Sequence, residues 1–159
     1  TVSGLTDGTS YTFTVTAANN IGISPPSSSS SSVTPASLAI GDNHKGGVIF
    51  YLDGNGGGMV VGTSDLVVDD YNGAVIQCSN YGSNGYTDWF LPSLNHLNLI
   101  NQNLVENDLL TWQSTEYYWS SNEGSGYDDN KAYIIRFFDN SDFLWLKVYN
   151  ANVRPVKSF

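Results

Sequence analysis

Hydrophobic and polar residues alternate strictly over residues 11–17, which read Tyr-Thr-Phe-Thr-Val-Thr-Ala. An alternation of period two places one set of side chains on each face, so this stretch predicts a half-buried antiparallel strand. Turn-forming residues flank it, with Asp7-Gly8 before it and Gly22 after it. Residues 23–33 are rich in Ser and Pro. They leave two interpretations open, a weak edge strand or a flexible linker.

A glycine-rich segment separates two short apolar runs, residues 46–52 and 59–62. Because β-branched and aromatic residues dominate these runs, they predict a hairpin over residues 47–62. The turn contains Asp53 and Asn55, as the opening of an EF-hand calcium loop does, but the bidentate Glu of such a loop is missing. A plain turn is therefore the preferred interpretation.

The most regular helical pattern follows Pro92. Apolar residues recur there at spacings of three and four, at Leu97, Ile100 and Leu104. Ser93 is a good N-cap residue, so a helix is predicted from residue 94 to residue 104. His96 stands where a capping box would carry Glu. We expect its side chain to face solvent, with contact to a ligand as the alternative.

A second, short helix is predicted over residues 70–80, where Ala74, Val75 and Cys78 fall on one side. Cys78 is the one cysteine of the chain, so an internal disulfide and a CxxC metal or redox centre are excluded. We expect it to be a small buried apolar side chain rather than a reactive thiol.

Aromatic strand formers dominate the last part of the chain. They form four runs, at residues 117–121, 131–138, 143–149 and 153–156. Residues 139–142 predict the turn between the second and third runs. In the third run the side chains of one face are Phe143, Trp145, Lys147 and Tyr149. Large aromatics with polar neighbours are typical of binding faces, whereas the opposite face is apolar and predicts core.

Composition divides the chain near residue 36. The segment before it holds a single charged residue, Asp7, and six consecutive serines, whereas every Trp, His, Lys and Arg comes later. We therefore predict a segment over residues 1–36 and a domain over residues 37–159. The chain has 159 residues, six Lys and Arg, and a formal net charge of -9, which argues against nucleic acid as a partner. The sequence lacks an apolar stretch of about 18 residues, so membrane insertion is not expected.

The first segment resembles the last third of a fibronectin type III domain. The residues that carry the resemblance are Gly4-Leu5, Asp7-Gly8, Tyr11, Val15, Ala17-Ala18-Asn19 and Gly22. The resemblance implies a tyrosine corner over residues 5–11 and a last strand at residues 33–35. The first strands and the core Trp of that fold are missing, so we expect a partial all-β sandwich. Either upstream chain is missing, or another chain supplies strands.

The second segment resembles the Lcl C-terminal domain family over residues 38–159. The motifs are Ile40-Gly41-Asp42, Gly46 to Tyr51, Gly85 to Ser93, Tyr118 to Glu123, and Val153 to Phe159. The resemblance implies an α+β, C-type-lectin-like fold with two helices, small twisted antiparallel sheets and neighbouring chain ends. It also implies that Trp89, Trp119 and Arg154 hold the core and its hydrogen-bond network.

Related domains present ligands on C-terminal strands and loops, which implies a ligand-binding role for this part of the chain. The candidate ligand-binding residues are Tyr127, Asp128, Asn130, Asn140, Asp142, Trp145, Lys147, Tyr149 and Asn150. Aromatic planes can stack on sugar rings, while Asn and Asp can bond hydroxyls. We expect a neutral glycan or a surface protein as ligand, because the net charge disfavours sulfated glycans. No metal or cofactor is expected.

Catalysis is not expected, because the sequence lacks the HExxH and Gly-x-Ser-x-Gly motifs and has only two histidines, His44 and His96. The leading hypothesis is an extracellular adhesion or recognition module, secreted or on a cell surface. The alternative is a structural subunit of a surface filament, phage fibre or injection-type particle. In that case residues 1–36 would add strands to neighbouring copies of the chain.

Overall fold

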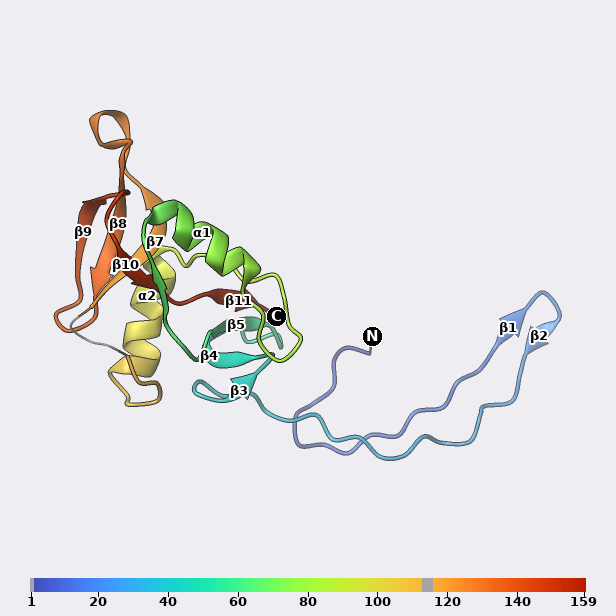
Figure 1. Cartoon of the computed structure of the whole chain (residues 1–159). Coiled ribbons are helices and arrows are strands. Elements are labelled where there is room, and N and C mark those ends of the chain that lie inside the picture. Colours follow the sequence, from blue (N-terminus) through green and yellow to red (C-terminus); the bar gives the residue numbers. More distant parts are fainter. Residues whose placement is uncertain (1, 113–115) are drawn as a thin grey trace. The chain divides into compact units, whose positions relative to one another are not determined.

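The computed structural model describes residues 2–112 and 116–159, and the chain divides into two compact units (Figure 1). The first unit ends at Leu38, and the second spans Ala39–Phe159. The composition boundary at residue 36 lies close to this division. The architecture is mixed α+β, with two α-helices and several sheets in the described residues.

The first unit is a long hairpin with little regular strand. Its strands are β1 (Ala18–Asn19) and β2 (Gly22–Ile23), and backbone hydrogen bonds extend the pairing as far as Tyr11 and Val33. Residues 24–32 form no regular strand, but the backbone N–H groups of Ser24, Ser27 and Ser30 bond to residues 13–17, so this stretch is not an unpaired linker either. The strand predicted over residues 11–17 is wrong, because only Tyr11 of these residues forms a strand bridge. Its expected half-buried face is wrong too at the centre, where Val15 is 72% exposed.

The second unit contains a four-stranded antiparallel sheet. Its order is β11 (Val156–Ser158), β5 (Gly58–Val61), β4 (Gly47–Leu52) and β3 (Asn43–His44). The hairpin predicted over residues 47–62 is confirmed as β4 and β5. In its turn the Asp53 carboxylate accepts the backbone N–H of Asn55 at 2.7 Å and of Gly57 at 3.0 Å. This carboxylate closes a plain turn, as expected.

A five-stranded sheet lies beside it. Its order is β6 (Leu66–Val68), β10 (Ala151–Val153), β7 (Tyr117–Glu123), β8 (Lys131–Arg136) and β9 (Ser141–Leu146). The sheet is not wholly antiparallel, because β10 pairs in parallel with β7. The single strand predicted over residues 153–156 is wrong. The chain leaves this sheet after Val153 and joins the other sheet at Val156, so Arg154-Pro155 connects two strands.

Both predicted helices are present. They are α1 (Tyr71–Asn80) and α2 (Leu94–Ile100), and α2 continues into the π-helical turn η1 (Asn101–Val105). Among the described residues, no helix has the length and apolar character needed to cross a membrane.

Both helices have side-chain caps at their N-termini, and the cap of α2 includes the His96 side chain. The Asp70 carboxylate accepts the Gly73 N–H at 2.7 Å and so caps α1. Ser93 caps α2 by accepting the His96 N–H at 3.2 Å, and His96 Nδ1 accepts the Ser93 N–H at 3.2 Å. His96 therefore closes the capping box itself, and its half-buried ring does not simply face solvent. It lies edge-on to Phe50 and Phe90.

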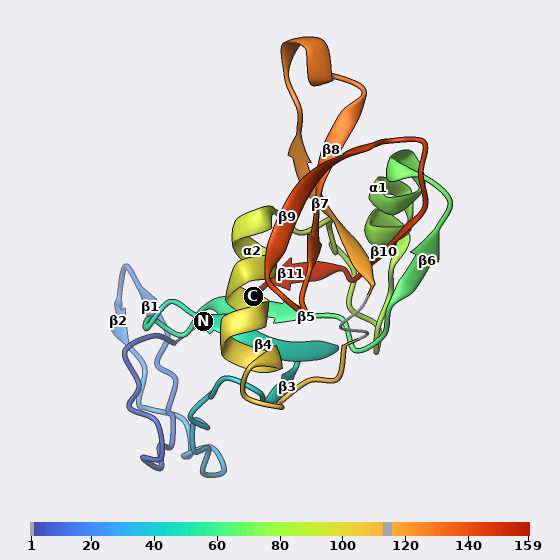
Figure 2. The same cartoon turned by 90° about the vertical axis from the view of Figure 1, so that its left-hand side faces the viewer.

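The two helices cover opposite faces of the five-stranded sheet (Figure 2). Tyr118 and Trp119 are adjacent on β7, so their side chains point to opposite faces. Tyr118 belongs to the cluster formed with α2, η1 and the four-stranded sheet. Trp119 belongs to the cluster formed with α1. Cys78 of α1 is fully buried in this second cluster, whereas Val75, predicted on the same side, is exposed.

A buried ion pair joins the segment before β6 to the connection between β10 and β11. Arg154 Nε lies 2.6 Å from Asp65 Oδ1, and both side chains are largely buried. Arg154 also donates to the Thr111 carbonyl oxygen at 3.2 Å, and the Tyr118 hydroxyl bonds Asp65 at 2.9 Å. The expected role of Arg154 in a core network is thus confirmed.

The two tryptophans expected with Arg154 are buried too. Trp89 donates its indole N–H to the Tyr86 carbonyl oxygen at 3.1 Å. Trp119 is fully buried, but its Nε1 has no hydrogen-bond partner in the described residues. Trp119 therefore contributes apolar packing and not hydrogen bonding.

Candidate ligand-binding surface

The outer part of one sheet face carries large aromatic side chains. β9 is an edge strand, and its Phe143 pairs with Ile134 of the neighbouring strand β8. Ile134 also pairs with Trp119 of β7, so these three side chains lie on one sheet face. Phe143 and Trp145 therefore lie on the same sheet face as α1. Because α1 packs against β6, β7 and β10, it leaves the side chains near β9 accessible, with Phe143 43% exposed.

Four rings form a contiguous group, which we call the aromatic surface: Tyr117, Phe143, Trp145 and Tyr149. Trp145 stacks on Tyr117 with ring centroids 5.3 Å apart. Tyr149 meets Trp145 edge-on at 5.7 Å, and Phe143 meets Tyr117 at 6.4 Å. The contacts hold the Trp145 ring in a defined orientation, while Tyr149 remains 49% exposed at the rim.

A pocket of about 380 Å³ adjoins the aromatic surface. Its walls come from four parts of the fold, and its lining residues are Val67, Glu116, Tyr117, Trp145, Asn150, Ala151 and Asn152. Its volume lies within the usual range of small-ligand sites. The indole Nε1 of Trp145 is shielded from solvent and has no hydrogen-bond partner within the described residues. Trp145 and the exposed Asn150 both line this pocket, whereas Asn152 pairs with Tyr118 and so directs its side chain to the opposite sheet face.

A protruding hairpin carries a further group of predicted residues. Figures 1 and 2 show the short 3-10 helix η2 (Gly126–Asp128) at the tip of the β7–β8 hairpin. Tyr127 there is fully exposed, and Asp128 pairs with Lys131 at 2.7 Å. The side chain of Asn130 is exposed. Its backbone oxygen accepts the Lys147 N–H at 2.9 Å, which ties the hairpin to the segment after β9.

Lys147 lies on the same sheet face as Trp145, as the alternation predicted, because its partners Glu123 and Tyr71 lie on that face. Its ammonium group is not free for a ligand, however, because it is bound to groups of the protein. The Lys147 ammonium pairs with Glu123, bonds the Asp129 carbonyl oxygen at 2.8 Å and lies 5.3 Å from the Tyr71 ring centroid. Lys147 therefore fastens the base of the hairpin.

The charges around this base shift two pKa values. The hydrogen bond from Lys147 holds the pKa of Glu123 below its ordinary value. Burial, and then the Glu123 charge, raise the pKa of Tyr71 to about 12. Tyr71 is therefore a neutral hydrogen-bond donor at physiological pH, and the Glu123 carboxylate is ionised. This arrangement is structural, because both groups are already paired.

Two predicted residues lie apart from the aromatic surface, Asn140 in the turn between β8 and β9 and Asp142 within β9. Asn140 adopts a positive φ of 53° and accepts a hydrogen bond from Asn101 at 3.4 Å. Asp142 lies opposite Ile135, so it points to the other sheet face. Of the predicted ligand-binding residues, Trp145, Tyr149 and Asn150 therefore lie at the aromatic surface or its pocket. The others lie elsewhere on the unit.

Sequence reasoning missed Tyr117 and the pocket walls supplied by β6 and β10. One signal could have found Tyr117. Alternation along the aromatic run places Tyr117 and Trp119 on one face, opposite Tyr118. Val67 carried no comparable signal, because its place beside the pocket depends on the pairing of β6 with β10.

No protein-family model matches the chain, and no curated protein matches it. Within residues 2–112 and 116–159, no group of three or more His, Cys, Asp or Glu side chains is arranged to hold a metal ion. The assignment of a function consequently rests on the geometry of the surface.

Proposed function

We propose that Ala39–Phe159 is a non-catalytic recognition module that binds a neutral glycan or a surface protein through the aromatic surface and its adjoining pocket. The observation that carries the proposal is the group of mutually packed rings beside a pocket that the exposed Asn150 also lines. Stacked indole and phenol rings offer apolar planes for sugar rings or for an apolar protein patch. The amide of Asn150, which lines the pocket, can both donate and accept hydrogen bonds.

The proposed fold of this unit is a C-type-lectin-like domain of the kind found in the Lcl C-terminal domain family. Two helices on opposite faces of a small sheet support it. So does the proximity of the unit's two ends, where the rings of His44 and Phe159 lie 4.5 Å apart. Such a module would act outside the cell, either secreted or displayed on a surface.

The states of Cys78 and His96 support a non-catalytic role. Burial raises the pKa of the Cys78 thiol to about 12, so it is not an available nucleophile. His96 uses Nδ1 in a helix cap, and burial lowers its pKa. Both groups are therefore committed to packing or to the fold.

The test is an array of neutral glycans and surface proteins probed with the full chain. Tyr149→Ala is expected to weaken saturable binding about tenfold, and Trp145→Ala at least as much, because each removes part of a stacking surface. Tyr51→Ala is the matched control, because Tyr51 is similarly exposed but lies on the four-stranded sheet. Binding that survives Tyr149→Ala and Trp145→Ala unchanged would contradict the proposal.

A second candidate function follows from the first unit, as a structural subunit of a surface filament, phage fibre or injection-type particle. Its hairpin leaves Val15 and Ile23 exposed. Tyr11 and Val15 direct backbone groups to Val33 and Ser27 in the other arm of the hairpin. By alternation, the N–H of Thr14 between them faces outward. An outward row of backbone groups is what strand addition requires.

Proline at Thr14 tests this candidate, because it removes the outward N–H while keeping φ in a range that strands tolerate. Thr14→Val keeps the N–H and serves as the control. Under the structural-subunit candidate, sedimentation shows assembly of the parent chain and of Thr14→Val, and loss of assembly in Thr14→Pro. A chain that stays monomeric at all concentrations would leave the recognition module as the function.

A further inference from the structure

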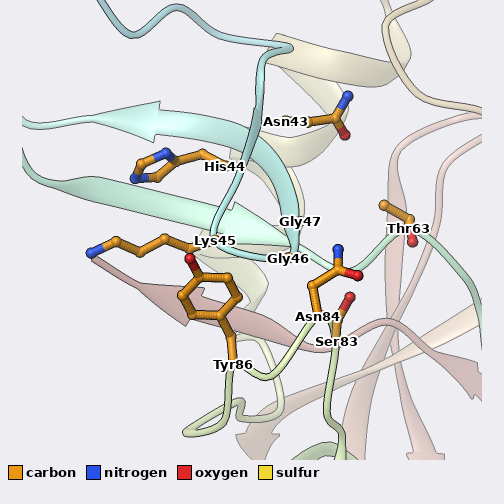
Figure 3. A pocket seen from close by; sticks show the side chains of 9 residues that line it. All are labelled: Asn43, His44, Lys45, Gly46, Gly47, Thr63, Ser83, Asn84 and Tyr86. Carbon is orange, nitrogen blue, oxygen red and sulfur yellow. The ribbon is translucent and has the colours of Figure 1, made fainter. Parts of the chain in front are cut away.

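A second concavity lies at the edge of the four-stranded sheet, away from the aromatic surface in the fold. Its volume is about 300 Å³, and three separate segments line it: residues 43–47, Thr63 and residues 83–86. Figure 3 shows the side chains of Asn43, Thr63, Ser83 and Asn84 on one side of the turn formed by residues 45–47. We call these four side chains the polar pocket.

The polar pocket holds hydrogen-bonding groups that the protein does not use. None of its four side chains makes a hydrogen bond to another described residue, so their capacity is left for solvent or a ligand. This differs from Asp53 and Asp70 elsewhere in the unit, whose side chains close turns and caps. Asn43, Thr63 and Asn84 are exposed and Ser83 is half-buried, so a ligand that enters the concavity can reach two amides and two hydroxyls.

The backbone around the polar pocket is closely packed and so preformed. A Cβ at Gly46 would lie 2.6 Å from the Ser83 carbonyl oxygen, and one at Gly47 would lie 2.5 Å from the Val61 carbonyl oxygen. The Ser83–Tyr86 turn is closed by two backbone hydrogen bonds of 2.9 and 3.3 Å. The turn of residues 45–47 therefore lies directly against the turn of residues 83–86, which fixes the spacing of Asn43 and Asn84.

Charge selects the class of ligand. No Asp or Glu lines the concavity in the described residues, so nothing there attracts a cation. Its one cationic side chain, Lys45, extends with His44 and Tyr86 to the other side of the turn in Figure 3 and lies 5.7 Å from the Phe159 ring centroid. The four polar-pocket side chains themselves are neutral. Each amide or hydroxyl both donates and accepts, as sugar hydroxyls do.

We infer that the polar pocket binds an uncharged, hydroxyl-rich ligand the size of one or two sugar rings. The volume lies at the lower end of the range for small-molecule sites, which matches a ligand of that size. The inference does not depend on the proposed function of the aromatic surface, because no residue is shared between the two pockets.

The experiment is an NMR titration of the full chain with the methyl glycosides of glucose, galactose and N-acetylglucosamine, and with methyl glucuronide as the charged comparison. Saturable shifts of the backbone amides of residues 43–47 and 83–86 are expected with at least one neutral glycoside. Asn43→Ala and Asn84→Gly should each weaken that binding about fivefold, because each removes one or two neutral hydrogen bonds to the ligand. Glycine suits position 84, because Asn84 has a positive φ of 51°.

Asn72→Ala is the matched control, since Asn72 is an exposed amide on α1 outside the pocket. Its binding should equal that of the parent chain. Three results would each overturn the inference: no saturable shift with any neutral glycoside, shifts confined to the aromatic surface, or tighter binding of the glucuronide. Because the shifts are mapped by residue, a failure of the polar pocket is distinguished from a failure of the aromatic surface.

Discussion

The two units of the chain use the same backbone hydrogen bonding but differ in what they bury. In the first unit, Tyr11 and Val33 exchange hydrogen bonds of 2.9 Å, yet Val15, Ile21 and Ile23 remain exposed. In the second unit, the sheets enclose two apolar clusters. A hydrogen bond contributes only about 1 kcal/mol net, whereas a fully buried large apolar side chain contributes about 2 kcal/mol. Burial, not strand pairing, therefore separates the stable unit from the marginal hairpin.

The largest expected effect is at the core of the second unit. Trp119→Ala should lower the free energy of unfolding by about 3–5 kcal/mol, because Trp119 of β7 is fully buried in the cluster formed with α1. Urea unfolding followed by far-UV circular dichroism measures it. Phe138→Ala, at an exposed turn position, is the control and should change the value by less than about 0.5 kcal/mol. Equal effects of the two substitutions would contradict the assignment of the core.

Arg154→Met should lower the free energy of unfolding by about 3 kcal/mol, because it leaves the largely buried Asp65 carboxylate without its cation. The double variant Asp65→Leu with Arg154→Met should recover much of that loss, since no unpaired charge remains. Thermal unfolding of the two variants measures the difference. A double variant that is less stable than Arg154→Met would show that the pair contributes more than mutual neutralisation.

A smaller effect on stability should appear when the pH is lowered, because His96 is half-buried. Burial lowers the folded pKa of His96 below the ordinary value of 6.5, so the unfolded chain takes up the proton first. The stabilisation is full above pH 6.5 and is lost as pH falls toward the lowered folded pKa. Urea midpoints measured at a series of pH values should therefore drop through this window.

His96→Gln sharpens that test, because Gln can also close a capping box but does not titrate. The drop in urea midpoint below pH 6.5 should be absent in this variant, while carboxylates still titrate nearer pH 4. An unchanged pH profile in His96→Gln would assign the effect to another group.

The smallest effect is expected in the first unit. Val15→Thr keeps strand propensity and removes an exposed apolar side chain, so the unfolding transition of the second unit should move by less than about 0.5 kcal/mol. The same urea experiment measures it. A shift as large as that of Trp119→Ala would mean that the hairpin contributes to a shared core, which would break the contrast between the units.

Local pattern was sufficient for several elements. The hairpin over residues 47–62 and the helix after Ser93 follow from period and cap chemistry within a few residues. The burial of Cys78 follows from its place on the apolar side of a helix. Such features depend on neighbours within one or two turns, which the sequence shows directly.

The sequence alone therefore determined the hairpin over residues 47–62, both helices and which side chains are apolar enough to be buried. Only the tertiary structure decided that the chain changes sheets at Arg154-Pro155, that Lys147 turns to Glu123, and that Tyr117 stacks on Trp145. It also brought Thr63 beside Asn43 and Asn84. The physical reason is that a period-two pattern assigns a side chain to a face, whereas its neighbours on that face depend on strand order and register, which long-range burial selects.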